Sequence, residues 1–120
     1  MILVLHNPRC SKSRAVLLMA EAAADRRGEP LTVRTYLEHP LSRAELETLH
    51  AQLGGLPARV LLRHEEAAFV ALGHDVSQMR DHEVLDVLAE LPGLLQRPVV
   101  VCGEKAVIGR PVEAVMGLLG

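Results

Sequence analysis

Cys10 lies where an apolar stretch, residues 2–5, gives way to a segment of helical spacing that begins near Ser11. A thiol at the start of a helix faces free backbone N–H groups and the positive end of the helix dipole, and both favour the thiolate. The pattern therefore predicts that Cys10 is a thiolate near neutral pH and acts as a nucleophile. The alternative is a buried cysteine that packs as a small hydrophobe.

Polar and basic side chains surround this cysteine in the sequence. His6 and Ser13 are close enough to hydrogen-bond a thiolate, although either could instead be structural, and Arg9 and Arg14 add positive charge. Position 13 is serine, so Cys10 has no partner of the Cys-x-x-Cys type. Any redox cycle must then be completed by a thiol from elsewhere.

Three further arginines border apolar segments. Arg63 follows the apolar run 60–62, Arg97 precedes the run 98–101, and Arg110 lies between a glycine and a proline. The guanidinium fork suits a tetrahedral oxyanion. Any one of the three could form a structural salt bridge, but as a set they predict an oxyanion site.

Other motifs carry less chemistry. The His-Glu pairs at 64–65 and 82–83 lack the histidine four positions on that a helical zinc site needs, so no metal site is expected. Cys102 ends an apolar run, where we expect burial rather than a role in resolving a Cys10 disulfide. With one Tyr, one Phe and no Trp, the chain lacks a stacking platform for nucleic acid.

Composition limits the class of protein. The 120 residues suit one domain spanning residues 1–120, and a net charge of −2 argues against binding to nucleic acid or anionic membranes. The two cysteines form neither a disulfide framework nor a zinc motif, which suits a reducing compartment. No stretch resembles a membrane span or a secretory signal, so we expect a soluble cytoplasmic protein. We also expect it to be a monomer.

The elements that would position these residues begin with a β-α-β unit. Residues 2–5 predict a buried strand, the segment from Ser11 to a C-cap at Gly28 predicts a helix, and residues 31–37 predict a half-buried strand. The apolar residues that share one face of this helix are Ala15, Leu18, Met19 and Ala22.

Residues 41–95 are predicted to form an inserted helical lobe. A capping box at Ser42 and Glu45 begins a helix that ends at the glycine pair 54–55, and residues 57–72 and 81–91 predict two more helices.

The C-terminal part returns to strands. Residues 98–102 and 105–108 predict two strands joined by a two-residue turn with Gly103 first, which is typical of a type II′ hairpin. A last helix is expected to open with Pro111 at its first position. The order βαβ, helices, ββα is that of a thioredoxin-like α/β fold with an insertion.

Four separated motifs together resemble the glutaredoxin-coupled arsenate reductase family, and the likeness extends over nearly the whole chain. The motifs are the segment His6-Asn7-Pro8-Arg9-Cys10-Ser11-Lys12-Ser13-Arg14, Arg63 after Leu61-Leu62, the run Arg97-Pro98-Val99-Val100-Val101, and Gly109-Arg110-Pro111. The chain looks closest to the short chromosomal members. The resemblance implies a glutaredoxin-type thioredoxin-like fold.

The resemblance also implies roles for residues. Cys10 would attack arsenate, and the oxyanion and the arsenylated intermediates would be bound by Arg63, Arg97 and Arg110. The positions that support the thiolate would be His6, Ser13 and Arg14, and Pro98 would be a structural cis-proline.

The implied reaction is the reduction of arsenate to arsenite without a bound cofactor. Glutathione would be the co-substrate that displaces the product from the Cys10 adduct, and glutaredoxin would then reduce the mixed disulfide.

Two other functions stay open from the sequence. A glutathione-linked thiol-disulfide oxidoreductase, or deglutathionylase, would use the same thiolate but would not need three arginines for an oxyanion. A non-enzymatic redox regulator, like the members of this superfamily that bind RNA polymerase, typically carries Cys-x-x-Cys, whereas Ser13 stands here.

Overall fold

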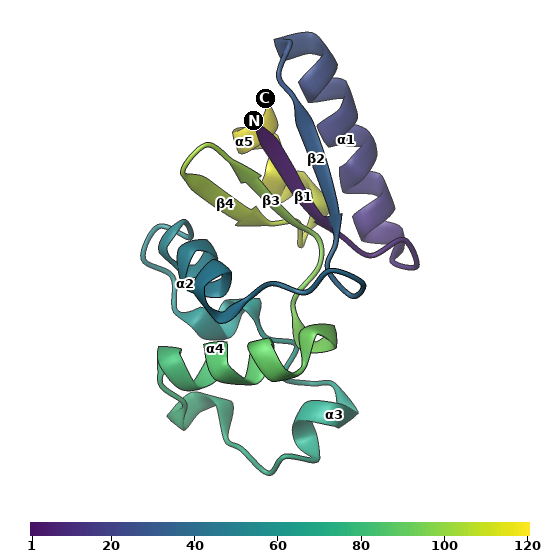
Figure 1. Cartoon of the computed structure of the whole chain (residues 1–120). Helices are drawn as coiled ribbons and strands as arrows, with labels where there is room; N and C mark the ends of the chain where they lie inside the picture. The colour runs from purple at the N-terminus through teal and green to yellow at the C-terminus, as the bar shows by residue number, and fades with distance from the viewer.

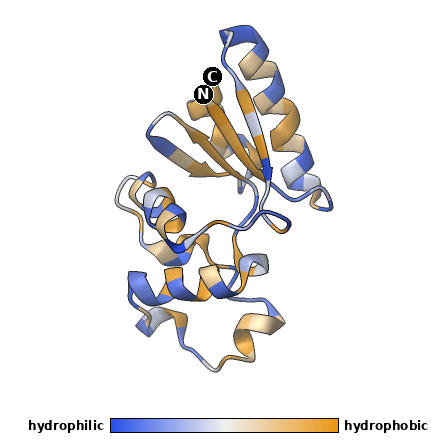
Figure 2. Ribbon diagram, viewed as in Figure 1, coloured by the Kyte–Doolittle hydropathy of each residue, from blue (hydrophilic) through white to orange (hydrophobic).

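The computed structural model describes all 120 residues and contains a single four-stranded sheet of order β2-β1-β3-β4. β1 (Ile2–His6) pairs in parallel with β2 (Leu31–Thr35) and antiparallel with β3 (Val99–Cys102), and β4 (Lys105–Ile108) forms the other edge (Figure 1). The central strands β1 and β3 are hydrophobic along most of their length (Figure 2). This is the thioredoxin-like order that the sequence predicted.

One face of the sheet is covered by α1 (Ser11–Arg27) and the C-terminal helix α5 (Met116–Leu119). α1 ends at Gly28, whose left-handed backbone (φ 62°) lets its N–H bond to carbonyls of the last turn. The core on this side consists of Ile2, Val4, Val16, Ala20, Ala23, Ala24, Val100, Val115 and Leu119.

The face of α1 that packs differs from the apolar face identified in the sequence. Leu18 is 69% exposed, whereas Val16 and Ala20 are fully buried. Ser13 is fully buried on the same side, where its hydroxyl bonds to the loop after β1. The small alanines let the helix approach the sheet closely, and the bonds of Ser13 set its rotation.

The inserted lobe lies beyond one end of the sheet and contains α2 (Arg43–Ala51), α3 (Ala67–Val70) and α4 (Asp81–Glu90) (Figure 1). The capping box of Ser42 and Glu45 is present at the start of α2. The lobe shares one hydrophobic cluster with the second face of the sheet, in which Leu5 and Val99 meet leucines such as Leu61 and Leu88.

The helix expected at 57–72 is wrong. A 3-10 helix spans Ala58–Leu61, Leu62 is extended, residues 64–66 form a turn and a bend, and the four-residue helix α3 follows. Leu62 forms a β-bridge with Leu95, the N–H of Arg63 donates to the carbonyl of Leu94, and the N–H of Gln96 donates to that of Leu61. These long-range bonds replace helical ones.

Other boundaries differ by less. β2 ends at Thr35 rather than 37, because the Thr35 carbonyl accepts from Glu38 and His39 in a turn. Gly103 has a positive φ of 61° and Glu104 does not, in keeping with a type II′ hairpin. The final helix begins as a 3-10 turn, Val112–Val115, with Pro111 at the N-cap rather than inside it. None of the helices is both long and apolar enough to span a membrane.

Candidate active site

A tight loop after β1 places Cys10 at the start of α1. The N–H of Cys10 donates to the carbonyl of Asn7 at 3.0 Å, and the N–H of Arg9 donates to the Asn7 side chain at 3.0 Å. Cys10 is the N-cap residue and has extended backbone angles, while Ser11 begins the helix. The side chain of Cys10 therefore lies beside free N–H groups of the first helical turn.

Ser13 and His6 hold this loop together. The Ser13 hydroxyl accepts from the N–H of Asn7 at 3.0 Å and lies 2.7 Å from Nδ1 of His6. Burial, and then the charge of Arg14, lower the pKa of His6, which favours a neutral ring that accepts from Ser13. Arg14 itself donates to the carbonyl of Pro8 at 2.9 Å. These side chains hold the loop that carries Cys10, and the hydroxyl of Ser13 bonds to His6 and Asn7 rather than to the sulfur.

The surroundings of Cys10 favour the thiolate. Burial alone would raise the pKa of the thiol, but the backbone N–H groups of Ser13 and Lys12 and the guanidinium of Arg97 bring it below the ordinary value. Two of these contributions come from the helix start and one from a residue 87 positions away in the chain.

Arg97 and Arg110 approach Cys10 from the other end of the chain. Nη2 of Arg110 lies 3.8 Å from the sulfur, and its Nε donates to the carbonyl of Arg97 at 2.8 Å. The Arg97–Pro98 peptide bond is cis, as is Arg110–Pro111. The N–H of Gly109 donates to the carbonyl of Pro98 at 2.9 Å, which joins the two arginine segments.

Arg63 reaches the same region from the lobe. It pairs with Glu66 and, together with Arg110 and Gln96, lines a polar cavity of about 230 Å³. The cavity therefore connects Arg63 to the arginine that contacts Cys10. Glu65 and Glu66 also line this cavity, whereas Cys10 and Arg97 do not, so Arg110 rather than Arg63 is the lining arginine that contacts the thiol.

The site contains a residue that the sequence reasoning missed. Tyr36 follows β2, is 1% exposed, and lies near Asn7, Arg97 and Arg63. Its hydroxyl and Nε of Arg97 are both buried without a hydrogen-bond partner. The β-α-β order in the sequence could have identified Tyr36. The two strands of such a unit are parallel and end at the same edge of the sheet, so the residues that follow β1 and β2 lie close together.

The remaining candidates lie elsewhere. Cys102 is partly buried at the end of β3 and pairs with Ile2, the first residue of β1. The loop that carries Cys10 follows His6, the last residue of β1, so the two cysteines lie at opposite ends of this strand. No group of three His, Cys, Asp or Glu side chains is arranged to hold a metal ion.

Comparisons with known proteins agree on one family. The model of the ArsC family matches residues 5–118. The arsenate reductase of Neisseria meningitidis serogroup A is 37% identical over 98% of this chain and 97% of its own length. The uncharacterized protein YfgD of Escherichia coli K12 is 39% identical over 98% of the chain and 95% of that protein. A solved structure of an arsenate reductase from Vibrio cholerae superposes with a TM-score of 0.79 at 38% identity, covering 97% of this chain and 95% of that one.

Proposed function

Since the chain belongs to the ArsC family, we propose that it is an arsenate reductase that forms a covalent adduct at Cys10. The observation that carries the proposal is the position of Arg110, with its guanidinium 3.8 Å from the sulfur of Cys10 and bonded to the backbone of Arg97. The proposed nucleophile and a proposed oxyanion-binding group are thus adjacent.

In the proposed reaction the Cys10 thiolate attacks arsenic of arsenate, and one arsenate hydroxyl takes up a proton from solvent and leaves as water. The arginines neutralise the charge on the remaining oxygens, and the helix start favours the thiolate before attack. A glutathione thiolate then attacks the Cys10 sulfur. The sulfur–arsenic bond breaks, its electron pair stays on arsenic as arsenite, and a mixed disulfide of Cys10 and glutathione remains.

Glutaredoxin is proposed to complete the cycle. Its thiolate attacks the glutathione sulfur of the mixed disulfide and releases the Cys10 thiolate. The position of Cys102 at the far end of β1 supports an external thiol, because no second cysteine of the chain lies near Cys10. Arsenate gains two electrons, and the thiols supply them.

The test is arsenite formation by the purified protein. Activity is expected with glutathione plus glutaredoxin and not without thiol, and Cys10→Ser should abolish it. A protein that reduces no arsenate under any thiol regime, while Cys10 is still reactive, would contradict the proposal. It would favour a thiol-disulfide oxidoreductase, which a glutathione mixed-disulfide substrate would reveal.

A further inference from the structure

Two buried polar atoms next to the active site lack a hydrogen bond. They are the hydroxyl of Tyr36 and Nε of Arg97. Leaving a buried polar group without a partner is unfavourable, so such groups are rare in native proteins and call for an explanation. β1 pairs His6 with Thr35 of β2 and Leu5 with Val99 of β3, so Asn7, Tyr36 and Arg97 lie together at one end of three adjacent strands.

Tyr36 is also adjacent to the loop that holds Cys10. The Asn7 side chain approaches the hydroxyl closely enough to affect its titration, although neither Asn7 nor Arg97 meets it with hydrogen-bonding geometry. The Asn7 side-chain oxygen accepts from the N–H of Arg9, which leaves its amide nitrogen free to donate. Although burial raises the pKa of Tyr36, Asn7 and Arg97 both act to lower it, as donors to its oxygen do, so each offers the hydroxyl a donor.

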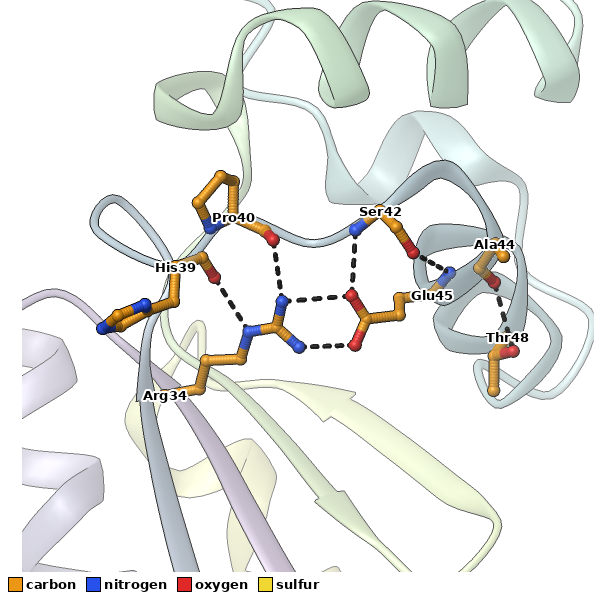
Figure 3. A network of polar contacts seen from close by, with 7 residues as sticks. All are labelled: Arg34, His39, Pro40, Ser42, Ala44, Glu45 and Thr48. Carbon is orange, nitrogen blue, oxygen red and sulfur yellow. Dashed lines mark hydrogen bonds and ion pairs between the residues drawn. The ribbon is translucent and has the colours of Figure 1, made fainter.

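The turn that carries Tyr36 is held in place. Arg34, in β2, donates to the carbonyls of His39 and Pro40 at 2.8 and 2.7 Å (Figure 3). It also forms a bidentate ion pair with Glu45 at the start of α2. With both ends of the turn fixed, Tyr36 cannot easily move to find another partner. The side chain that can adjust is the guanidinium of Arg97.

We propose that Tyr36 is a positioning residue of the oxyanion site: when an anion binds, Nε of Arg97 donates to the Tyr36 hydroxyl, which also accepts from the side-chain amide of Asn7. This rests on the proposed function, because it assumes an oxyanion at the arginines. The relay satisfies both unpaired atoms at once and ties Arg97 to the Cys10 loop. Burial raises the pKa of Tyr36, so its proton is retained throughout the working pH range.

The test uses sulfate, an unreactive tetrahedral dianion, as the probe. Its affinity is measured as protection of Cys10 from alkylation, and thermal stability is recorded with and without sulfate. Tyr36→Phe removes only the hydroxyl. We expect about fivefold weaker sulfate binding, the equivalent of one hydrogen bond. Without sulfate the variant should be as stable as the wild type or more so, because the lost hydroxyl has no partner there. Thr48→Val, which removes an exposed hydroxyl of α2, should leave the protection of Cys10 by sulfate unchanged.

A double-mutant cycle with Arg97→Lys separates this role from a packing effect. Lysine keeps the charge and lacks Nε, so Tyr36→Phe should cause no further loss of sulfate affinity in that background. Unchanged sulfate affinity in Tyr36→Phe, or fully additive losses, would overturn the relay and leave arsenate reduction intact. Weaker sulfate binding in Tyr36→Phe, with the cycle non-additive and no arsenate turnover, would support the relay and contradict the function. A wild type that binds no sulfate would overturn the relay and remove support for an oxyanion site.

Discussion

At the scale of single residues, the reactivity of Cys10 depends on groups from both ends of the chain. The N–H groups of Lys12 and Ser13 belong to its own helix, whereas Arg97 and Arg110 arrive with the C-terminal strands. The local groups are present in any chain that forms this helix. The two arginines are present only when the sheet is assembled, so full reactivity requires the folded protein.

Replacing Arg97 with glutamine should raise the pH midpoint of Cys10 alkylation. The wild-type midpoint is expected below 9.0, the ordinary thiol value, because the arginine and the helix N–H groups outweigh burial. Removing the charge makes the thiolate less favourable, so a higher pH is needed to form it. Arg59→Gln, an exposed arginine in the 3-10 helix, is the matched control. A midpoint that stays at the wild-type value in Arg97→Gln would show that Arg97 does not contribute to activating the thiol.

At the scale of elements, short segments between strands and helices position the site. Gly109 follows β4 and lies against Pro98, which follows Arg97. The turn after β2, which carries Tyr36, is closed by Arg34 and Glu45 (Figure 3). Each segment joins an element of the sheet to a residue near Cys10. A substitution in either segment should therefore alter the active site although the substituted residue does not contact Cys10.

Gly109→Ala should destabilise the protein and reduce arsenate reduction. An added Cβ would lie 2.8 Å from Cγ of Pro98 and 3.0 Å from Cγ2 of Val16, and both are packed side chains. Overpacking of this kind costs about 1–3 kcal/mol and would shift the neighbouring Arg97. Urea denaturation and the arsenite assay measure the two effects. Gly117→Ala, where a Cβ meets nothing within 4 Å, should be neutral or slightly stabilising. Equal effects of the two substitutions would contradict the close-packing argument.

The ion pair of Arg34 and Glu45 should make stability depend on acid pH. The hydrogen bond from Arg34, followed by that from the Ser42 N–H, lowers the pKa of Glu45 from 4.5 to about 2. The stabilisation is therefore complete above pH 4.5 and is lost as the pH falls toward 2. Glu45 is 47% exposed, so solvent screening makes the effect small. Glu45→Gln should be less stable than the wild type above pH 4.5, and this difference in the free energy of unfolding should shrink as the pH falls toward 2. Glu90→Gln should show no such change with pH. A difference that does not vary with pH would argue against the pair.

At the scale of the whole molecule, the sheet separates the two cysteines. Cys102 pairs with Ile2 at one end of β1, and the loop to Cys10 leaves from His6 at the other. At about 3.3 Å per residue the strand ends are about 13 Å apart, whereas a disulfide needs Cβ atoms within about 4.5 Å. The folded monomer therefore offers Cys10 no internal thiol.

Oxidation should accordingly give no intramolecular disulfide. Treating the native protein with oxidised glutathione should attach one glutathione to Cys10, which mass spectrometry of the peptides detects. Cys102→Ser should retain most of the arsenite-forming activity. A Cys10–Cys102 disulfide in the monomer, or loss of turnover in a folded Cys102→Ser protein, would show that Cys102 is a resolving cysteine.

The sequence by itself determined the features that depend on neighbours along the chain. The strand, loop and helix start around Cys10 and the capping box at Ser42 are local patterns, and the structure has all of them. The order of strands and helices also followed from local periodicity, and it was sufficient to predict the thioredoxin-like fold.

Only the tertiary structure decided what depends on distant partners. The segment after Leu61 is extended because its backbone bonds to residues 94–96, and no helical pattern could reveal that. The packing face of α1 is set by the bonds of Ser13 to the loop after β1, so Leu18 faces solvent despite its hydrophobicity. The parallel pairing that brings Tyr36 to the active site could be inferred from the β-α-β order, but Arg97 lies near Tyr36 only because β3 pairs with β1, and these segments are far apart in the sequence.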